Sequence, residues 1–449
     1  MDTSDPASTT VPAGDGAAAS EPRPCPEVWD YVDGLDKLGW RLGLERVKKL
    51  VGELGDPQRS YRTIHVVGTN GKSSTARFIS ALLEEQGLKV GAYVSPHLVS
   101  LAERQMVNSV PSTEEEFCEL VNRVKQAADE VEKTLPEDDR LTQFEVLTAA
   151  ALLHFKEAGC DVAVIEAGLG GRLDATSVIS SDIQVLTSIG LEHTDLLGDS
   201  ESAILKEKAA VIPVGGTVVA GALEPAIKSE LGAYCDQREA ACYFLGDQVV
   251  VLADPKAATF DIFGVYGCYT DLSLSLLGSY QRDNAAVAVA AAELFTGNDL
   301  DPDNVRSALV RTVNPGRLEV ISKQPLCIFD GSHNAQGMAE TMQALDRILE
   351  RRRLIAVVSV LGDKDVGRMM EELAPKCDII FATQTSSPRT LPADDVAAIL
   401  AGFEKGPEVF VDPDPRSALM SAYRLATSNQ VVLVTGSFTL IADLKRSLS

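Results

Sequence analysis

The chain has 449 residues, of which 45% are hydrophobic and 24% are charged, and its formal net charge is −24. This length predicts two or three domains, and the composition is that of a soluble globular protein. The acidic charge argues against nucleic acids and anionic membranes as partners, because both bind basic surfaces. No apolar run approaches the roughly 18 residues that span a bilayer, and no signal peptide is recognisable at the N-terminus. We therefore expect a cytoplasmic protein.

Residues 1–26 are rich in Ala, Pro, Ser, Thr and Gly, which predicts a disordered tail. The apolar pattern that follows restarts near residue 314, so we expect a first domain over 27–312 and a second over 313–449. Within the first domain, the stretch 213–277 has short alternating runs and many turn residues. We expect a small β-rich insertion there.

The segment 63–74 joins a predicted strand to a predicted amphipathic helix through a glycine turn. Its pattern, Gly68-x-x-Gly71-Lys72-Ser73, is shorter than the general P-loop, but its flanking elements are those of a phosphate-binding loop. Backbone N–H groups and the helix dipole attract an anion there, and Lys72 adds a full positive charge. The Ser73 hydroxyl can face a phosphate-bound Mg²⁺. The segment predicts the binding of a nucleotide triphosphate such as ATP.

Polar residues follow three more predicted strands of this domain, at Ser95, Glu166 and His193. Ligands bind beyond the carboxyl ends of strands in open α/β sheets, and a carboxylate beside a phosphate loop is suited to Mg²⁺. Ser-Pro is often a simple turn and a lone histidine is often structural, so the residues alone leave Ser95 and His193 open. Charged residues on a helix face are most often exposed to solvent. The residues alone therefore predict solvated charges at Lys206 and Lys208 on the following helix.

The second domain alternates strands and helices, which predicts a doubly wound, Rossmann-like α/β fold. The predicted strands are 325–329, 354–360, 378–382, 407–411 and 431–435, and the predicted helices are 335–350, 365–374, 392–402, 415–427 and 437–447. The first domain is predicted to be a P-loop-type ATPase domain with a mostly parallel central sheet. The stretch after Glu166 has Leu173 where a dinucleotide fingerprint needs its last glycine, which excludes nicotinamide binding.

Several motifs occur in an order that resembles the folylpolyglutamate synthase/dihydrofolate synthase branch of the Mur ligase superfamily. The resemblance runs from about residue 30 to the C-terminus. The motifs are Gly-Leu-Glu-Arg (43–46), His-Val-Val-Gly-Thr-Asn-Gly-Lys-Ser-Ser (65–74), Ser-Pro-His-Leu (95–98), Phe-Glu (144–145), Glu-Ala-Gly-Leu-Gly-Gly-Arg-Leu-Asp-Ala-Thr (166–176), Gly-Leu-Glu-His-Thr (190–194), Glu-Lys-Ala (207–209), Pro-Gly-Arg-Leu-Glu (315–319), Asp-Gly-Ser-His-Asn (330–334) and Thr-Gly-Ser (435–437).

The resemblance implies a ligase reaction. ATP phosphorylates a substrate carboxylate, and the amino group of L-glutamate attacks the acyl phosphate to give an amide, ADP and phosphate. Positioning and charge neutralisation are most of what this chemistry requires. The implied acceptors are a folate and, from the Gly-Arg-Leu-Asp form of the loop at 171–174, dihydropteroate. The resemblance also implies a monomer with two Mg²⁺ sites.

The same resemblance implies roles for individual residues. Those that hold ATP are Asn70, Gly71, Lys72, Ser73, Ser74, Asn284, Arg317, Asp330 and His333. The metal ligands are Ser95, Glu166 and His193, and the residues that line the pterin pocket are Thr142, Gln143, Phe144, Glu145, Leu173, Asp174 and Ala175. Lys72, Glu166, His193 and Lys208 are the catalytic set, and Lys208 aligns with a lysine that the family carries as a carbamate.

Three hypotheses are therefore open. Ser73, Ala210 and Ser332 depart from the usual residues of this branch, which puts the acceptor in doubt more than the ligase activity. A Mur-type ligase with a non-folate acceptor, such as a cell-wall precursor, is the alternative. It lacks support because only about 60 residues precede the first phosphate-loop strand. A non-catalytic nucleotide switch is the third, and no Asn-Lys-x-Asp guanine-recognition motif supports it.

Overall fold

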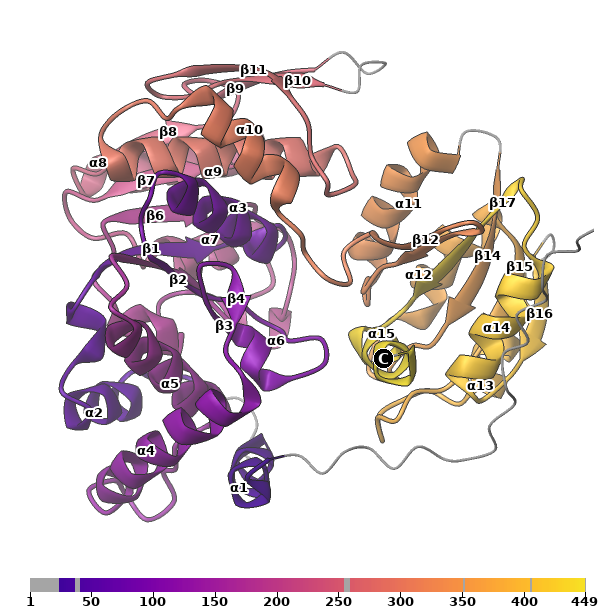
Figure 1. The fold of residues 1–449 in the computed structure, drawn as a ribbon, viewed down its shortest axis with the longest axis horizontal. Helices are drawn as coiled ribbons and strands as arrows, with labels where there is room; N and C mark the ends of the chain where they lie inside the picture. The colour runs from indigo at the N-terminus through magenta and orange to yellow at the C-terminus, as the bar shows by residue number, and fades with distance from the viewer. Residues whose placement is uncertain (1–23, 37–40, 254–258, 350–351, 404–405, 449) are drawn as a thin grey trace, which may run out of the picture.

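The computed structural model describes residues 24–36, 41–253, 259–349, 352–403 and 406–448, which form two α/β units, each around its own sheet (Figure 1). Most of the predicted N-terminal tail lies outside the described residues, and helix α1 (Pro26–Asp36) begins at its last position. No helix within the described ranges is long and apolar enough to cross a membrane.

The first unit contains an eight-stranded sheet. Its strands are β1 (Arg62–Val67), β2 (Val90–Tyr93), β3 (Gln105–Val107), β4 (Val110–Pro111), β5 (Val162–Glu166), β6 (Ile183–Leu186), β7 (Thr217–Ala220) and β8 (Ala241–Phe244). Their order is β4-β3-β2-β5-β1-β6-β7-β8, parallel from β2 to β8 and antiparallel at β3 and β4. Strand β1 lies between β5 and β6, so the phosphate loop is flanked by the ends of both strands.

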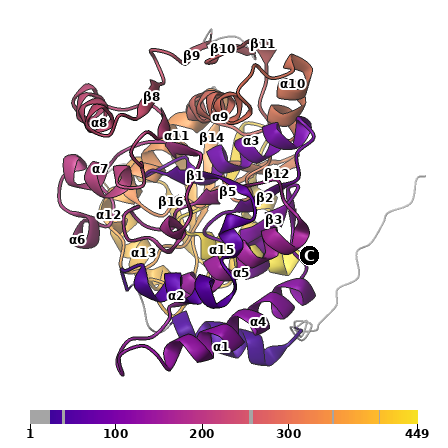
Figure 2. The same ribbon diagram turned by 90° about the vertical axis from the view of Figure 1, so that its left-hand side faces the viewer.

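Helices cover both faces of this sheet (Figure 2). They are α2 (Glu45–Glu53), α3 (Lys72–Glu85), α4 (Glu114–Glu132), α5 (Gln143–Ala158), α6 (Thr194–Leu197), α7 (Glu201–Ala209), α8 (Pro225–Gln237), α9 (Tyr280–Thr296) and α10 (Pro302–Arg311). One buried apolar cluster joins the sheet to α3, α9 and α10, and a second joins its other face to α1, α2, α4 and α5. The Ala/Val-rich sequence of α9 suits the first cluster, because small side chains let α9 approach α3 closely.

The predicted β-rich insertion over 213–277 is only partly correct. Strands β7 and β8 belong to the main sheet, with α8 between them. Only β9 (Val250–Leu252), β10 (Phe260–Phe263) and β11 (Cys268–Leu272) form a separate antiparallel sheet. Short apolar runs look alike whether they join a parallel sheet or form a hairpin, and the sequence pattern did not separate the two.

The second unit confirms the predicted alternation. Its strands are β12 (Glu319–Lys323), β13 (Leu326–Phe329), β14 (Arg353–Val358), β15 (Cys377–Ala382), β16 (Glu408–Val411) and β17 (Gln430–Thr435), and its helices are α11 (Ala335–Leu349), α12 (Val366–Leu373), α13 (Ala393–Leu400), α14 (Pro415–Leu425) and α15 (Phe438–Leu448). The sheet order is β12-β13-β17-β14-β15-β16. Strand β12 was not predicted. It is an antiparallel edge strand with largely exposed side chains, so it lacks the apolar run of a buried strand.

His65 in β1 should make stability depend on pH. Its ring is buried beside the Thr176 hydroxyl, with Nε2 2.9 Å from Oγ, and burial lowers its pKa to about 4. The unfolded chain binds a proton near pH 6.5 and the folded chain does not, so stability falls as pH drops from about 6.5 to 4. We expect a loss of about 3 kcal/mol, since one pKa unit is about 1.4 kcal/mol. Urea unfolding across this range should show the slope, and His65→Gln should flatten it. An equal slope in the variant would contradict the assignment.

Candidate active site

The phosphate loop has the backbone shape that an anion site needs. Gly71 caps α3 with φ 85°, and no side chain caps this helix end. A Cβ at Gly71 would lie 2.5 Å from Asn284 Oδ1, so glycine is required by both conformation and space. Lys72 folds back over the loop, and its Nζ donates to the carbonyls of Gly68 (2.8 Å) and Thr69 (2.9 Å). The free helix N-terminus and the adjacent ammonium group fit a triphosphate.

Glu166, at the end of β5, is buried beside this loop and meets two predicted partners. Its Oε1 accepts from the Ser73 hydroxyl (2.8 Å) and its Oε2 accepts from the Ser95 N–H (2.9 Å). The Ser73 hydroxyl also lies 3.2 Å from the Ser95 carbonyl. Burial raises the pKa of Glu166, and the charge of Lys72 opposes this shift. A buried carboxylate among hydroxyl and carbonyl oxygens is the donor set that Mg²⁺ prefers.

His193 lies in the loop between β6 and α6, with φ 44° at the start of α6. Burial lowers its pKa, the carboxylate of Glu192 raises it, and the charges of Lys364, Lys72 and Lys208 lower it further. The His193 side chain itself is exposed, in the loop directly after Glu192. In the described part of the chain, no group of three or more His, Cys, Asp or Glu side chains could hold a metal ion. A metal here would rely on the Glu166 carboxylate with serine and nucleotide oxygens, and the role of His193 as a ligand stays a prediction.

Lys208 is buried, and our expectation of a solvated charge from the helix pattern was wrong. It is 1% exposed, and its Nζ lies 2.8 Å from the Gly68 carbonyl and 2.6 Å from Glu192 Oε1. Helix α7 comes this close because position 171 is glycine, where a Cβ would lie 2.7 Å from the Glu207 carbonyl. Lys206, in contrast, has a 71% exposed side chain, as expected.

Glu192 is a site residue that we did not predict from the sequence. Burial would raise its pKa, but the charges of Lys72 and Lys208 hold the pKa below its usual value. Burial and the charge of Lys72 in turn lower the pKa of Lys208 to about 8. The available signal was its place in the Gly-Leu-Glu-His-Thr motif, directly before His193.

Gln281 and Asn284 from α9, and Asn314 from the chain after α10, support the start of α3. The Ser74 hydroxyl accepts from Gln281 Nε2 (3.2 Å) and Asn314 Nδ2 (3.0 Å), so it points away from the anion site. Its backbone N–H, in the first turn of α3, is what Ser74 can offer a phosphate. Asn284 Nδ2 donates to Gln281 Oε1 (3.0 Å), which holds its amide against Gly71.

The second unit reaches the phosphate loop through α11. Asn70 Nδ2 donates to Glu340 Oε1 at 3.2 Å. The Asp330 carboxylate accepts from the N–H groups of Leu318 and Ser332 and from the hydroxyls of Ser332 and Thr341. The Asp330 carboxylate therefore stabilises the loop that carries it. A nucleotide contact by Asp330 stays a prediction.

Arg317 and His333 both contact the ring of Phe438 in this unit. The Arg317 guanidinium sits 4.5 Å from the Phe438 ring centroid, and the His333 ring lies 5.8 Å from the same centroid. His333 Nδ1 is 2.9 Å from the Gly331 carbonyl, and burial lowers the pKa of its ring. Donation from Nδ1 leaves Nε2 as the atom that His333 could present to a ligand.

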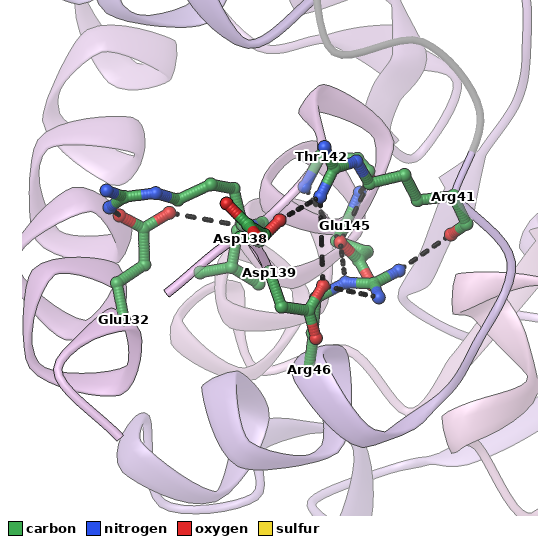
Figure 3. A network of polar contacts seen from close by, with 9 residues as sticks. Arg41, Arg46, Glu132, Asp138, Asp139, Thr142 and Glu145 are labelled. Atoms are coloured by element: carbon green, nitrogen blue, oxygen red, sulfur yellow. Dashed lines mark hydrogen bonds and ion pairs between the residues drawn. The ribbon is translucent and has the colours of Figure 1, made fainter. Parts of the chain in front are cut away.

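The predicted pterin-pocket residues fall into two groups. Figure 3 shows that Thr142 and Glu145 form the capping box of α5, and that Glu145 pairs with Arg46 at 3.1 Å. A second carboxylate of this set, Asp174, accepts from the Leu169 and Thr176 N–H groups. The polar atoms of these three side chains are thus already hydrogen-bonded or ion-paired within the protein. The pocket role of all three stays a prediction.

The remaining members of that set are more accessible, apart from the buried Ala175. Gln143, Phe144 and Leu173 are half-buried. The Phe144 ring packs on the loop after β5, because a Cβ at Gly168 would lie 2.5 Å from it. Phe144 and the loop that carries Leu173 are thus brought together, at the same carboxyl edge of the sheet as Glu166.

Comparisons with known proteins agree with this geometry. Residues 66–292 match the Mur ligase middle domain, and residues 316–438 match the Mur ligase glutamate ligase domain. A dihydrofolate synthase/folylpolyglutamate synthase of Bacillus subtilis is 33% identical over 93% of this chain and 97% of its own. The chain belongs to the Mur ligase family, in its folylpolyglutamate synthase/dihydrofolate synthase branch.

Solved structures of this branch have the same fold. The folylpolyglutamate synthase of Mycobacterium tuberculosis complexed with ADP superposes with a TM-score of 0.86 at 33% identity, covering 94% of this chain and 98% of that one. A bifunctional folylpolyglutamate synthase/dihydrofolate synthase with Mn, AMPPNP and L-glutamate bound gives a TM-score of 0.80 at 30% identity, covering 94% and 98%.

Proposed function

We propose that the chain is an ATP-dependent ligase that joins L-glutamate to a folate and to dihydropteroate. The observation that carries this proposal is the buried Glu166 carboxylate, which lies against Ser73 and Ser95 directly beside the phosphate loop. The relatives named above support the choice of glutamate and of folate acceptors. We also propose 27–312 and 313–449 as the two domains, since α10 ends at Arg311 and β12 begins at Glu319.

In the proposed reaction, the acceptor carboxylate attacks the γ-phosphorus of ATP, and ADP leaves. The amino group of glutamate then attacks the acyl phosphate, so an amide bond forms and phosphate leaves. Lys72 and the N-terminus of α3 hold and neutralise the phosphates. Glu166, with Ser73 and Ser95, would hold a divalent cation, which polarises phosphoryl oxygens when it is bound.

We further propose that Lys208 acts as a carbamate. Its amine would add CO₂ and release a proton, which turns a cation into an anion suited to a second metal ion. A pKa of about 8 supports this step, because only the neutral amine reacts. The Glu192 carboxylate 2.6 Å away would then have to separate from Lys208, since two anions cannot share that contact.

The proposed function is tested by offering MgATP and L-glutamate with either dihydropteroate or a reduced folate. We expect phosphate release with both acceptors, and a product one glutamyl unit heavier in each case by mass spectrometry. Release with folate alone would restrict the enzyme to polyglutamylation. Bound ATP without release on either acceptor would favour a Mur-type ligase for a different acceptor.

A further inference from the structure

Two cysteines that are far apart in the sequence lie together where α1 meets α4. Cys25 directly precedes α1 and is half-buried, and Cys118 is buried near the start of α4. Cys118 Sγ lies 3.5 Å from the Pro24 carbonyl oxygen. That oxygen is about 2.3 Å from the next backbone nitrogen, so Cys118 Sγ is within about 6 Å of the Cys25 backbone. A hydrogen bond joins the two thiols, which brings their sulfur atoms together as a disulfide requires.

The chain on either side of Cys25 holds its thiol against α4. The Pro24 carbonyl also accepts from Trp29 Nε1 at 3.0 Å, and the Trp29 ring stacks on Phe117 with the centroids 5.2 Å apart. Cys25 has φ 53°, a left-handed conformation that side chains disfavour, and it lies between Pro24 and Pro26, whose rings restrict the backbone. The two thiols can therefore react with each other without a rearrangement of the chain.

Helix α1 is an element that a covalent link would stabilise. It is the first helix of the described chain, and its buried face consists of Val28, Trp29, Val32 and Leu35. Elements near a chain end open at the lowest cost in free energy. Gln143 Nε2 at the start of α5 donates to the Val32 carbonyl at 3.2 Å, so opening of α1 would also release Gln143. A bond at the first turn of α1 opposes that opening.

A second pair of cysteines offers a comparison. A hydrogen bond also joins Cys235 at the end of α8 to Cys242 in β8. These two residues are 7 positions apart, whereas Cys25 and Cys118 are 93 positions apart. The restriction that a disulfide places on the unfolded chain grows with the length of the closed loop. A link between Cys25 and Cys118 therefore has the larger effect on the opening of the structure.

We propose that Cys25 and Cys118 form a redox modification site, in which a small-molecule disulfide oxidises the two thiols to a disulfide bond that fastens α1 to α4. Disulfides of this kind are usually transient and redox-sensing where the surroundings are reducing. Neither thiol takes part in the proposed ligase reaction, so the modification site stands or falls independently of it.

The oxidation is a double thiol–disulfide exchange. The half-buried Cys25 loses its proton and attacks the reagent RSSR, which forms a mixed disulfide and releases one RS⁻. Cys118 then loses its proton and attacks the Cys25 sulfur, which forms the protein disulfide and releases the second RS⁻. Two protein thiols are oxidised, and the reagent is reduced to two small thiols. Burial raises the pKa of Cys118 to about 12, which makes it the second nucleophile and not the first.

The first test is peptide mapping after incubation with oxidised glutathione and alkylation of the remaining thiols in urea. We expect a peptide pair linked through Cys25 and Cys118, which dithiothreitol separates, and a glutathione on the exposed Cys268 as proof that the reagent acted. In Cys118→Ser the glutathione should stay on Cys25. If that variant does not fold, Cys25→Ser should lack the linked pair. A wild type in which Cys118 is alkylated, with Cys25 either free or still bound to glutathione, would overturn the site.

The second test is amide hydrogen exchange over residues 26–36 in the reduced and the oxidised protein. Oxidation should slow exchange in α1 at least about tenfold in the wild type, because the link opposes opening of the helix. Cys235→Ser is the matched control and should show the same slowing, whereas Cys25→Ser should exchange equally in both states. Equal exchange in the reduced and oxidised wild type would show that the link does not fasten α1.

Discussion

Glu166→Gln is expected to lose at least about a thousandfold in kcat for glutamate-dependent phosphate release. The substitution keeps the size of the side chain and its contacts with Ser73 and Ser95, but it removes the negative charge that a divalent cation needs. Loss of metal-assisted charge stabilisation is worth several kcal/mol in the transition state, and about 1.4 kcal/mol is a tenfold change in rate. The measurement is steady-state phosphate release over a range of Mg²⁺ and Mn²⁺ concentrations.

The control for this variant is Glu85→Gln, at the far end of α3, where the carboxylate pairs with Arg311 at 2.9 Å. It should retain wild-type kcat. The melting temperature of Glu166→Gln should stay at or above that of the wild type, because a neutral amide is easier to bury than a carboxylate. A kcat within tenfold of the wild-type value would show that the metal is held elsewhere.

Lys208→Ala is expected to lose at least about a hundredfold in kcat, with partial recovery in millimolar formate or acetate. The deletion removes the proposed carbamate and leaves space beside the Gly68 carbonyl, which a small carboxylate can enter. The missing anion would be one ligand of a second metal ion, and loss of transition-state charge stabilisation accounts for the size of the effect. The measurement is kcat against added carboxylic acid at fixed ionic strength.

The matched control is Lys206→Ala, on the same helix but with an exposed side chain, and it should behave as wild type. A ¹³C NMR signal from ¹³CO₂-treated wild type that is missing in Lys208→Ala would identify the carbamate directly. Recovery by simple amines instead of acids would show that Lys208 acts as the ammonium partner of Glu192. Full activity of Lys208→Ala would remove both roles.

Local patterns were sufficient for the elements that carry the site. The run 63–74 predicts its strand, turn and helix, because glycine conformations and apolar periodicity act within a few residues. Glu166 could be placed at the ligand edge of the parallel sheet for a similar reason, since it ends a buried strand, and its role toward a metal stays a prediction. The alternation in 325–447 likewise predicts the second unit, apart from its exposed edge strand.

Interactions between distant segments were not predictable in this way. Lys208 has the local pattern of a solvated helix residue, and it is buried because a glycine 37 positions earlier lets α7 approach the loop. The partner of Lys208, Glu192, lies in the loop between β6 and α6. The resemblance places Thr142 and Glu145 in the pterin pocket, yet their side chains form the helix cap and the ion pair with Arg46.

The sequence by itself therefore determined the fold class, the phosphate loop, the Glu166 position and, through ordered motifs, the family. Each of these depends on residues that are close along the chain or that a strand end carries to a known edge. The tertiary structure decided which charges are buried and which side chains they pair with, above all Lys208, which is buried against Glu192. Burial and pairing depend on which segments pack together in three dimensions, and the charge of a side chain gives no information about its distance from a partner 100 residues away.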